Sequence, residues 1–290
     1  MALSWLDVWW ISEVVIVAST YVLGLSKAGS AEPKDQRPAG AKLAFYQFNK
    51  RIFTYYLFGF AWTAWVAWSA VSCYVLGNEA QENMVWLMYT LVPAKRTLTT
   101  EPTSVLLALG LLELHLLRRI FESSRISIFS RRQALNIVDI LLSYCFYAAA
   151  ALSIIADGPE LSPQNVSLAD LGIRHLIAVP LYLFASLHQH RANKIFAKLR
   201  RNRFGHIVTT NYGKPKGDWF ELVSSPHYLA EVLIYSSIGI VLGANGSTWI
   251  FLCAYLITQQ IITALNTHLW YQKKFEDYPS NRKAIIPYVL

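Results

Sequence analysis

Seven apolar segments most constrain what this chain can fold into. They cover residues 5–25, 52–76, 103–117, 134–156, 171–187, 228–242 and 248–269. A helix needs about 17–25 predominantly apolar residues to cross a bilayer. Several of these segments are slightly shorter, so their predicted ends are defined only to within a few residues. Because lipid offers no partners to backbone amides and carbonyls, spanning segments of this kind form helices. We therefore predict an all-α, polytopic membrane protein with seven transmembrane helices.

The charges of the connecting loops test this number of spans. Lys and Arg number 6, 5, 8 and 4 after the first, third, fifth and seventh segments, but 2, 0 and 0 after the second, fourth and sixth. Lys and Arg are enriched in cytoplasmic loops. The alternation predicts a lumenal N-terminus and a cytosolic C-terminus. With no internal repeat and no soluble domain in view, residues 1–290 are expected to form one integral membrane domain.

The composition agrees with a membrane protein and argues against several other classes. Hydrophobic residues make up 54% and charged residues 15% of the chain, against roughly 25% charged residues in soluble domains. In so apolar a chain, the net charge of +8 is better explained by loop asymmetry and an anionic ligand than by nucleic acid. We expect the lipid bilayer as a partner and no nucleic acid.

Common nucleotide and metal motifs are absent from the sequence. There is no GxGxxG and no GxxxxGK[ST], so neither a Rossmann nor a P-loop site is expected. His188 and His190 form an HxH pair, but neither an HxxxH nor an HxxHH box accompanies it, and no metal is predicted. Any nucleotide must therefore be held by side chains from several helices.

Ionisable residues within or beside the apolar segments are candidate functional groups. Such residues are costly in a membrane unless they are paired or functional, and each could equally be a structural contact between helices. They are Glu113, His115, Asp139, Glu231 and His268. The arginines of the basic connectors bind either phosphate groups of a ligand or lipid headgroups.

Several longer motifs resemble a known family. The C-terminal stretch THLWYQKKFEDYPSNRKAIIPYVL resembles the signature of the steroid 5-alpha-reductase superfamily. GDWFELVSSPHYLAE, SLHQHRANKIFAKLRRNRFG, HLLRRIFESSRISIFS and NKRIFTYYLF resemble its polyprenol (polyprenal) reductase branch, the type 3-like members. These motifs lie between Asn49 and Leu290, so the resemblance covers most of the chain.

The resemblance implies a multi-pass reductase of the endoplasmic reticulum membrane that uses NADPH. The implied reaction saturates the carbon–carbon double bond of the alpha-isoprene unit of polyprenal or polyprenol, on the route to dolichol and protein N-glycosylation. Hydride goes to the β carbon of the enal, and charge develops on the carbonyl oxygen, where a hydrogen-bond donor is needed.

The resemblance also assigns roles to residues of this chain. The cofactor-binding pattern falls on Arg119, Gln189, Asn193, Arg200, Asp218, His227, Glu231 and Tyr271. We expect His268 to be the most function-sensitive residue, with Glu231 near the nicotinamide and His115 near the reacting carbonyl. The donor to that carbonyl is unassigned, and Tyr55 is one candidate.

Departures from the steroid-reducing members argue against a steroid as the main substrate. Those members carry a Gln-Glu pair early in the second helix, where this chain reads RIFTYYLF without an acid. Leu116 stands where they carry a Tyr, and His227 where they carry an Asn. Two alternatives remain: a steroid 5-alpha-reductase or trans-2-enoyl reductase of the same architecture, and a lipid-binding membrane protein without catalysis.

Overall fold

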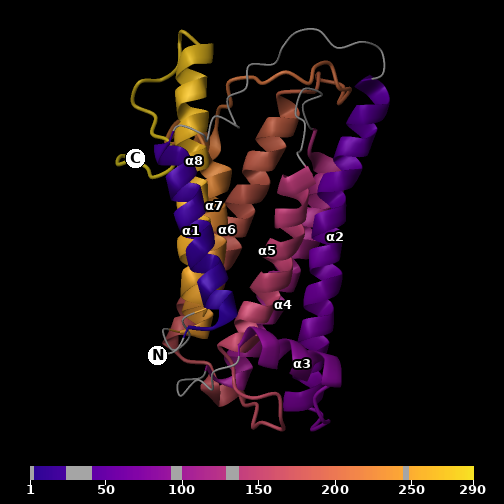
Figure 1. Cartoon of the computed structure of the whole chain (residues 1–290). Coiled ribbons are helices and arrows are strands. Elements are labelled where there is room, and N and C mark those ends of the chain that lie inside the picture. Colours follow the sequence, from indigo (N-terminus) through magenta and orange to yellow (C-terminus); the bar gives the residue numbers. More distant parts are fainter. Residues whose placement is uncertain (1–2, 24–40, 93–99, 129–136, 244–247) are drawn as a thin grey trace.

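The computed structural model describes residues 3–23, 41–92, 100–128, 137–243 and 248–290, with the backbone alone for 41–52 and 137. Helices dominate the described chain, and no β-strand forms in it. The α-helices are α1 (Trp5–Val22), α2 (Ala41–Tyr74), α3 (Glu82–Leu91), α4 (Pro102–Phe121), α5 (Ile137–Ala156), α6 (Ile173–Lys198), α7 (Pro226–Leu242) and α8 (Thr248–Lys274). Figure 1 shows the long helices side by side, with the short α3 at the lower end.

The prediction of an all-helical protein is confirmed, and each predicted apolar segment coincides with one helix. The main differences are extensions: α2 begins at Ala41 instead of residue 52, and α6 runs on to Lys198 instead of ending at residue 187. α6 continues because its polar last turns face a polar network inside the bundle. Predicted span residues 24–25 and 134–136 lie outside the described residues.

Three of the described helices are long and apolar enough to cross a membrane. They are Trp5–Val22, Val138–Ala156 and Thr248–Lys274, while Pro226–Leu242 is apolar but shorter. The length and the apolar composition of these helices indicate a membrane protein. α4 and α6 do not meet the same standard because each carries several charged or polar side chains, so the prediction of seven spans stays a prediction.

Local sequence signals set several helix ends. Ser4 and Asp7 form a capping box at the start of α1, with Asp7 N 3.1 Å from Ser4 Oγ. The first position of α4 is Pro102 and that of α7 is Pro226, where the missing amide hydrogen costs no helical bond. The buried carboxylate of Asp157 accepts bonds from the first two amides of α8, at 3.2 and 2.9 Å, which stabilises that helix start.

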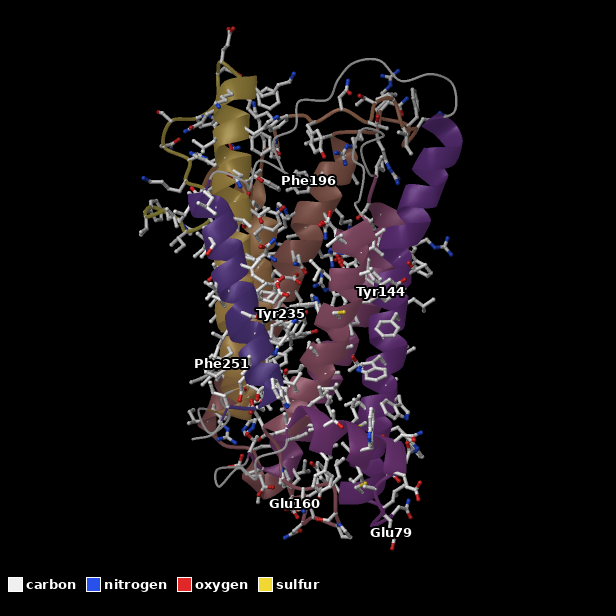
Figure 2. The ribbon with its side chains drawn as sticks, viewed as in Figure 1. Glu79, Tyr144, Glu160, Phe196, Tyr235 and Phe251 are labelled. Carbon is white, nitrogen blue, oxygen red and sulfur yellow. The ribbon has the colours of Figure 1, made fainter. Side chains whose placement is uncertain are left out.

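The helices pack around one main apolar core. α2 packs on α4 and α5, α6 on α7, and α1 and α7 on α8. The main core contains Trp10, Tyr74, Leu112, Ile154 and Trp249. Tyr235 of α7 also belongs to it, and Figure 2 shows this residue at mid-height.

Candidate active site

An interior cavity of about 270 Å³ lies between α2, α4, α5, α6, α7 and α8. Its wall carries polar side chains from α4, α6, α7 and α8 and aromatic side chains that include residues of α2, α5 and α8. The polar lining residues are Arg119, Gln189, Asn193, His227, Glu231, Gln259 and Gln260. The aromatic ones include Tyr56, Phe146, Tyr147 and Tyr255. The cavity therefore has both polar groups that can bind a polar ligand and an apolar, aromatic surface.

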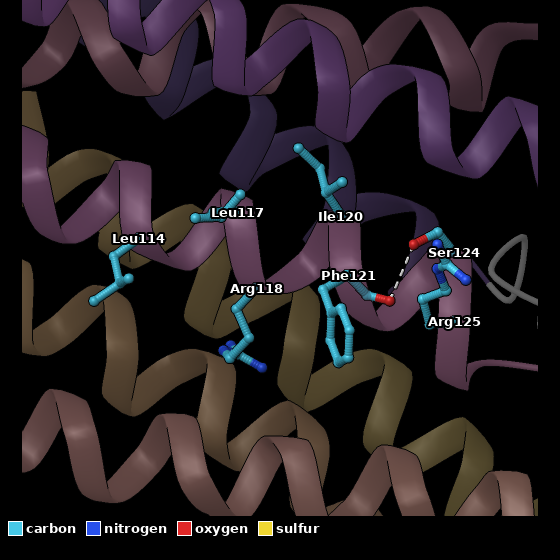
Figure 3. A pocket seen from close by; sticks show the side chains of 7 residues that line it. All are labelled: Leu114, Leu117, Arg118, Ile120, Phe121, Ser124 and Arg125. Atoms are coloured by element: carbon cyan, nitrogen blue, oxygen red, sulfur yellow. Dashed lines mark hydrogen bonds between the residues drawn. The ribbon is translucent and has the colours of Figure 1, made fainter.

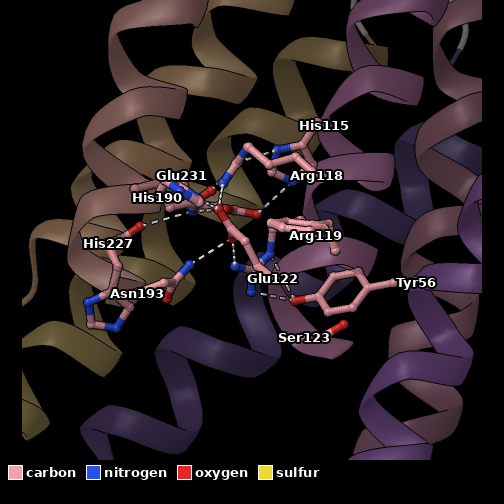
Figure 4. A network of polar contacts seen from close by, with 12 residues as sticks. Tyr56, His115, Arg118, Arg119, Glu122, Ser123, His190, Asn193, His227 and Glu231 are labelled. Atoms are coloured by element: carbon pink, nitrogen blue, oxygen red, sulfur yellow. Dashed lines mark hydrogen bonds and ion pairs between the residues drawn. The ribbon is translucent and has the colours of Figure 1, made fainter. Parts of the chain in front are cut away.

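Glu122 is the centre of the polar network beside this cavity (Figure 4). Its carboxylate accepts hydrogen bonds from Arg118 Nη1 at 2.7 Å and Arg119 Nη1 at 2.9 Å. Asn193 Nδ2 at 2.8 Å and His190 Nδ1 at 2.9 Å approach it from α6. The Glu122 side chain is 0% exposed, and a buried charge is tolerated when it is paired and hydrogen-bonded in this way.

The backbone is distorted where this acid sits. Glu122 opens a π-helical turn, Glu122–Ile126, that continues α4 directly. π-Helical turns are rare and occur frequently at functional sites. The distortion ends α4 with the Glu122 carboxylate turned back toward the arginines of the preceding turn.

Gln189 joins the arginine side of the network to Glu231. Its side-chain oxygen accepts a hydrogen bond from Arg118 Nη2, and its amide nitrogen donates to Glu231 Oε2. The same nitrogen lies 3.2 Å from the carbonyl oxygen of His227. α6 thus holds the Glu231 carboxylate in a fixed position on α7.

His115 is fully buried between Arg118 and Glu231. Arg118 Nη2 lies 3.1 Å from His115 Nδ1, and because a guanidinium only donates, Nδ1 must accept. The ring proton is therefore on Nε2, which lies 3.4 Å from Glu231 Oε1. That contact is too long for a good hydrogen bond, and Nε2 has no hydrogen-bond partner among the described residues.

Arg119 connects the network to α2. It donates to the hydroxyl oxygen of Tyr56 from Nη2 at 2.6 Å and from Nε at 3.2 Å. Tyr55, proposed from the sequence as a carbonyl donor, packs against Tyr56 with ring centroids 4.6 Å apart and stacks on Tyr147 at 6.1 Å. Tyr55 thus adjoins two cavity residues, and its catalytic role stays a prediction.

Five of the predicted cofactor-binding residues meet at the cavity: Arg119, Gln189, Asn193, His227 and Glu231. Sequence reasoning could not show that they converge, because they come from three helices. The Nδ1 atom of His227 is buried without a hydrogen-bond partner in the described part of the chain. A polar atom left over in a cavity wall is typical of a site that a ligand completes.

Two further predicted cofactor-binding residues lie outside this cavity. Arg200 is buried, donates to the carbonyl oxygen of Ile128 and lies over the Tyr212 ring at 5.1 Å. Burial lowers the pKa of its guanidinium, against the opposing effect of Tyr212. The Asp218 carboxylate accepts a hydrogen bond from His188 Nδ1 at 2.9 Å. The His188 ring stacks on Trp219.

His268 and Tyr271 belong to a separate group near the C-terminal tail. His268 Nδ1 lies 2.7 Å from Ser224 Oγ, which in turn lies 2.6 Å from Tyr278 Oη. Gln272 Nε2 lies 2.9 Å from His268 Nε2, and Tyr271 stacks on Tyr278. Neither residue lines the cavity, so the predicted roles of His268 in catalysis and Tyr271 in cofactor binding stay predictions.

An open groove runs along the outer face of α4 (Figure 3). It has a volume of about 530 Å³ and is lined by Leu114, Leu117, Ile120 and Phe121, with Arg118 midway along it and Arg125 at one end. Arg118 lines this groove and also binds Gln189 and Glu122 inside the bundle. The groove and the polar network therefore meet at one guanidinium.

Sequence reasoning missed Glu122 and Tyr56 as parts of this site. For Glu122 a signal existed, because it is the only acid in the basic connector RRIFESSRISIFSRR. Tyr56 gave none, since aromatic residues in an apolar helix are usually core. Among the described residues no group of His, Cys, Asp and Glu is arranged to hold a metal.

Comparisons with known proteins agree with the resemblance seen in the motifs. The family model described as 3-oxo-5-alpha-steroid 4-dehydrogenase matches residues 164–290. A polyprenal reductase of Xenopus tropicalis is 41% identical over 194 residues, 64% of this chain and 61% of that protein. The chain thus spans less than two thirds of the length of that relative, and only 59% of the Xenopus laevis protein.

Other relatives match over nearly the whole chain. The Homo sapiens polyprenal reductase is 30% identical over 277 residues, 92% of this chain and 83% of that protein. The Danio rerio polyprenal reductase is 30% identical over 256 residues, 87% of this chain and 82% of that protein. Given a match of this extent, the chain belongs to the polyprenal reductase family, and its C-terminal part carries the region shared with 3-oxo-5-alpha-steroid 4-dehydrogenases.

Proposed function

We propose that this chain is a membrane reductase that uses NADPH to saturate the alpha-isoprene double bond of polyprenal or polyprenol. The observation that carries the proposal is the cavity, where a network of arginine, amide and carboxylate groups meets an aromatic wall inside an apolar helical bundle. The relatives described above are polyprenal reductases, which supports the same chemistry. The product serves dolichol synthesis and protein N-glycosylation.

The membrane arrangement is part of the proposal. One domain over residues 1–290 crosses the endoplasmic reticulum membrane seven times, with a lumenal N-terminus and a cytosolic C-terminus. The alternating loop charges support this arrangement, as does the coincidence of each predicted span with a helix. The arginine-rich ends of α4 and α6 then face the cytosol, where NADPH is available.

The residues of the cavity fit a dinucleotide cofactor. Arg119 supplies a guanidinium for phosphate oxygens, and Gln189, Asn193 and Glu231 supply amide and carboxylate groups for sugar hydroxyls and a carboxamide. The unpartnered Nδ1 of His227 offers a further contact. Ligand cavities are about 300–1,000 Å³, so the observed 270 Å³ has room for one end of the cofactor. Arg200, Asp218 and Tyr271 are proposed to bind the remainder.

When bound, the reduced nicotinamide supplies a hydride to the β carbon of the unsaturated aldehyde. The negative charge that then develops on the carbonyl oxygen must meet a positioned donor. His115 is suited to this because Arg118 fixes its tautomer and leaves the Nε2 proton unused. Glu231, held by Gln189, orients the ligand at the same end of the cavity, and His268 completes the proposed catalytic residues.

The isoprenoid chain of the substrate needs an apolar path. The groove along α4 offers Leu114, Leu117 and Phe121, and Arg118 connects it with the polar network. This arrangement suits a substrate with a polar head and a long apolar tail. The match to the steroid dehydrogenase family model favours one alternative, a reductase of a steroid enone.

NADPH oxidation by the purified, detergent-solubilised protein separates these functions. The reactions contain polyprenal, polyprenol, a steroid enone or a trans-2-enoyl thioester. We expect oxidation with polyprenal and none with the steroid. NADPH oxidation with the steroid alone would support the steroid reductase. If folded protein oxidises NADPH with none of the four compounds, a lipid-binding protein without catalysis is the remaining function.

A further inference from the structure

Tyr235 carries a buried hydroxyl group that the fold leaves unused. It lies on α7 one turn after Glu231, which places both side chains on the same face of the helix. Its side chain is fully buried, and its hydroxyl has no hydrogen-bond partner among the described residues. Buried tyrosine hydroxyls usually find a partner, so this one requires an explanation.

Two other fully buried tyrosines of the same bundle have hydrogen-bonded hydroxyls. Tyr182 Oη donates to the Leu111 carbonyl oxygen at 2.9 Å. Tyr74 Oη donates to the Pro159 carbonyl oxygen at 2.8 Å. The fold therefore places acceptors where a tyrosine serves structure, and Tyr235 is an exception within this group.

A second unused donor lies against Tyr235. The rings of Tyr235 and His115 meet edge to face, with centroids 5.7 Å apart. His115 Nε2 carries its proton because Arg118 occupies Nδ1, and this proton is also without a hydrogen-bond partner in the described residues. The two donors belong to neighbouring buried residues, one on α4 and one on α7, and a hydrogen bond is stronger in such a buried place than in water.

The two donors lie directly behind the cavity wall. Glu231 lines the cavity and is 3.4 Å from His115 Nε2. Phe146 also lines the cavity, and its ring centroid is 5.8 Å from that of Tyr235. Both donors therefore belong to side chains that pack against the cavity wall.

We propose that Tyr235 is the missing carbonyl donor and that its hydroxyl, together with His115 Nε2–H, binds the aldehyde oxygen of the substrate. This inference rests on the proposed function. Hydride addition at the β carbon shifts the alkene electron pair to form a bond between the α and carbonyl carbons, and the carbonyl pair moves to oxygen. The two donors stabilise that oxyanion until a proton from water adds to the α carbon and restores the aldehyde. This step requires the aldehyde as substrate, because an allylic alcohol has no conjugated carbonyl group whose oxygen can take up the negative charge.

Tyr235→Phe tests this role, with Tyr74→Phe as the matched control. Both variants remove one buried hydroxyl and nothing else. We measure kcat with polyprenal, the Kd for NADPH and the Tm of each purified protein. For Tyr235→Phe we expect kcat to fall about 100-fold, with unchanged NADPH affinity and a Tm that does not fall, because no hydrogen bond is lost. For Tyr74→Phe we expect an unchanged kcat and a lower Tm.

The possible results separate this inference from the proposed function. If the wild-type protein reduces polyprenal and Tyr235→Phe keeps its kcat, the inference alone is overturned. It is also overturned if Tm or NADPH affinity falls together with kcat, because the hydroxyl is then structural. If the folded wild-type protein reduces no enal, the proposed function fails and the inference fails with it.

Discussion

The carboxylate of Glu122 and the side-chain amide of Asn193 meet at 2.8 Å, although 71 residues separate them in the chain. This bond joins the end of α4 to α6. Asn193 and the neighbouring Arg119 both line the cavity. One buried acid therefore holds two groups of the cavity wall in place.

Glu122→Gln should destabilise the protein strongly. Gln keeps the shape of the side chain but leaves Arg118 and Arg119 without their charged partner. Removing one member of a buried ion pair costs about 3–5 kcal/mol, so we expect the free energy of unfolding to fall by about 3 kcal/mol and the Tm to fall with it. Glu79→Gln, on an exposed loop, should leave the Tm unchanged. Equal Tm values for the two variants would contradict the importance of this network.

Arg119→Lys should weaken cofactor binding. The guanidinium of Arg119 holds Tyr56 with two nitrogens and Glu122 with a third, which the single ammonium group of Lys cannot reproduce. We expect the Kd for NADPH to rise about 10-fold, or about 1.4 kcal/mol, in a fluorescence titration. The control is Arg203→Lys, on an exposed loop. An unchanged Kd for Arg119→Lys would remove Arg119 from the proposed cofactor site.

His268→Ala should abolish NADPH oxidation with polyprenal if the role expected from the sequence holds. In the structure His268 instead contacts Ser224 and Gln272, outside the cavity wall. Activity and Tm of the variant, measured together, separate these readings. A normal turnover with a lowered Tm would show that His268 supports the C-terminal region and takes no part in the chemistry.

The ion pair between Glu101 and Arg174 predicts a pH-dependent contribution to stability. Burial raises the pKa of Glu101, but a backbone hydrogen bond and Arg174 outweigh it, and the net pKa lies below the ordinary 4.5. A carboxyl group with a lowered folded pKa stabilises the protein above its unfolded pKa and loses that effect as pH falls through the folded value.

Glu101→Gln should therefore lower the Tm at pH 7, and the difference from the wild type should shrink below about pH 4. The effect is small, about 0.5 kcal/mol, because the Glu101 side chain is 44% exposed and solvent screens the pair. A difference in Tm that is the same at both pH values would contradict this assignment.

The helices could be predicted from the sequence because apolar runs and loop charges act locally. The family resemblance is confirmed by the relatives, and the all-helical fold by the structure. The boundaries of α2 and α6 were less predictable, since their extensions mix polar and charged residues with apolar ones and form no continuous apolar run. Whether a polar turn continues a helix depends on the partners it meets in the fold.

The arrangement of the candidate site could be predicted only in part. The motifs named Arg119, Asn193 and Glu231, but their meeting at one cavity depends on how α4, α6 and α7 pack. The packing of α8 likewise decides that His268 lies beside Ser224, and its catalytic role stays a prediction. Tyr235 could not be singled out, because only the structure shows which buried hydroxyl lacks a partner.

The most direct test of the account follows the hydride itself. The purified protein is given polyprenal and NADPH carrying deuterium at the transferable position of nicotinamide C4, and the product is examined by mass spectrometry and NMR. The account predicts a saturated aldehyde with one deuterium on the β carbon. Deuterium on the aldehyde carbon of an allylic alcohol, or no transfer by folded protein, would contradict it.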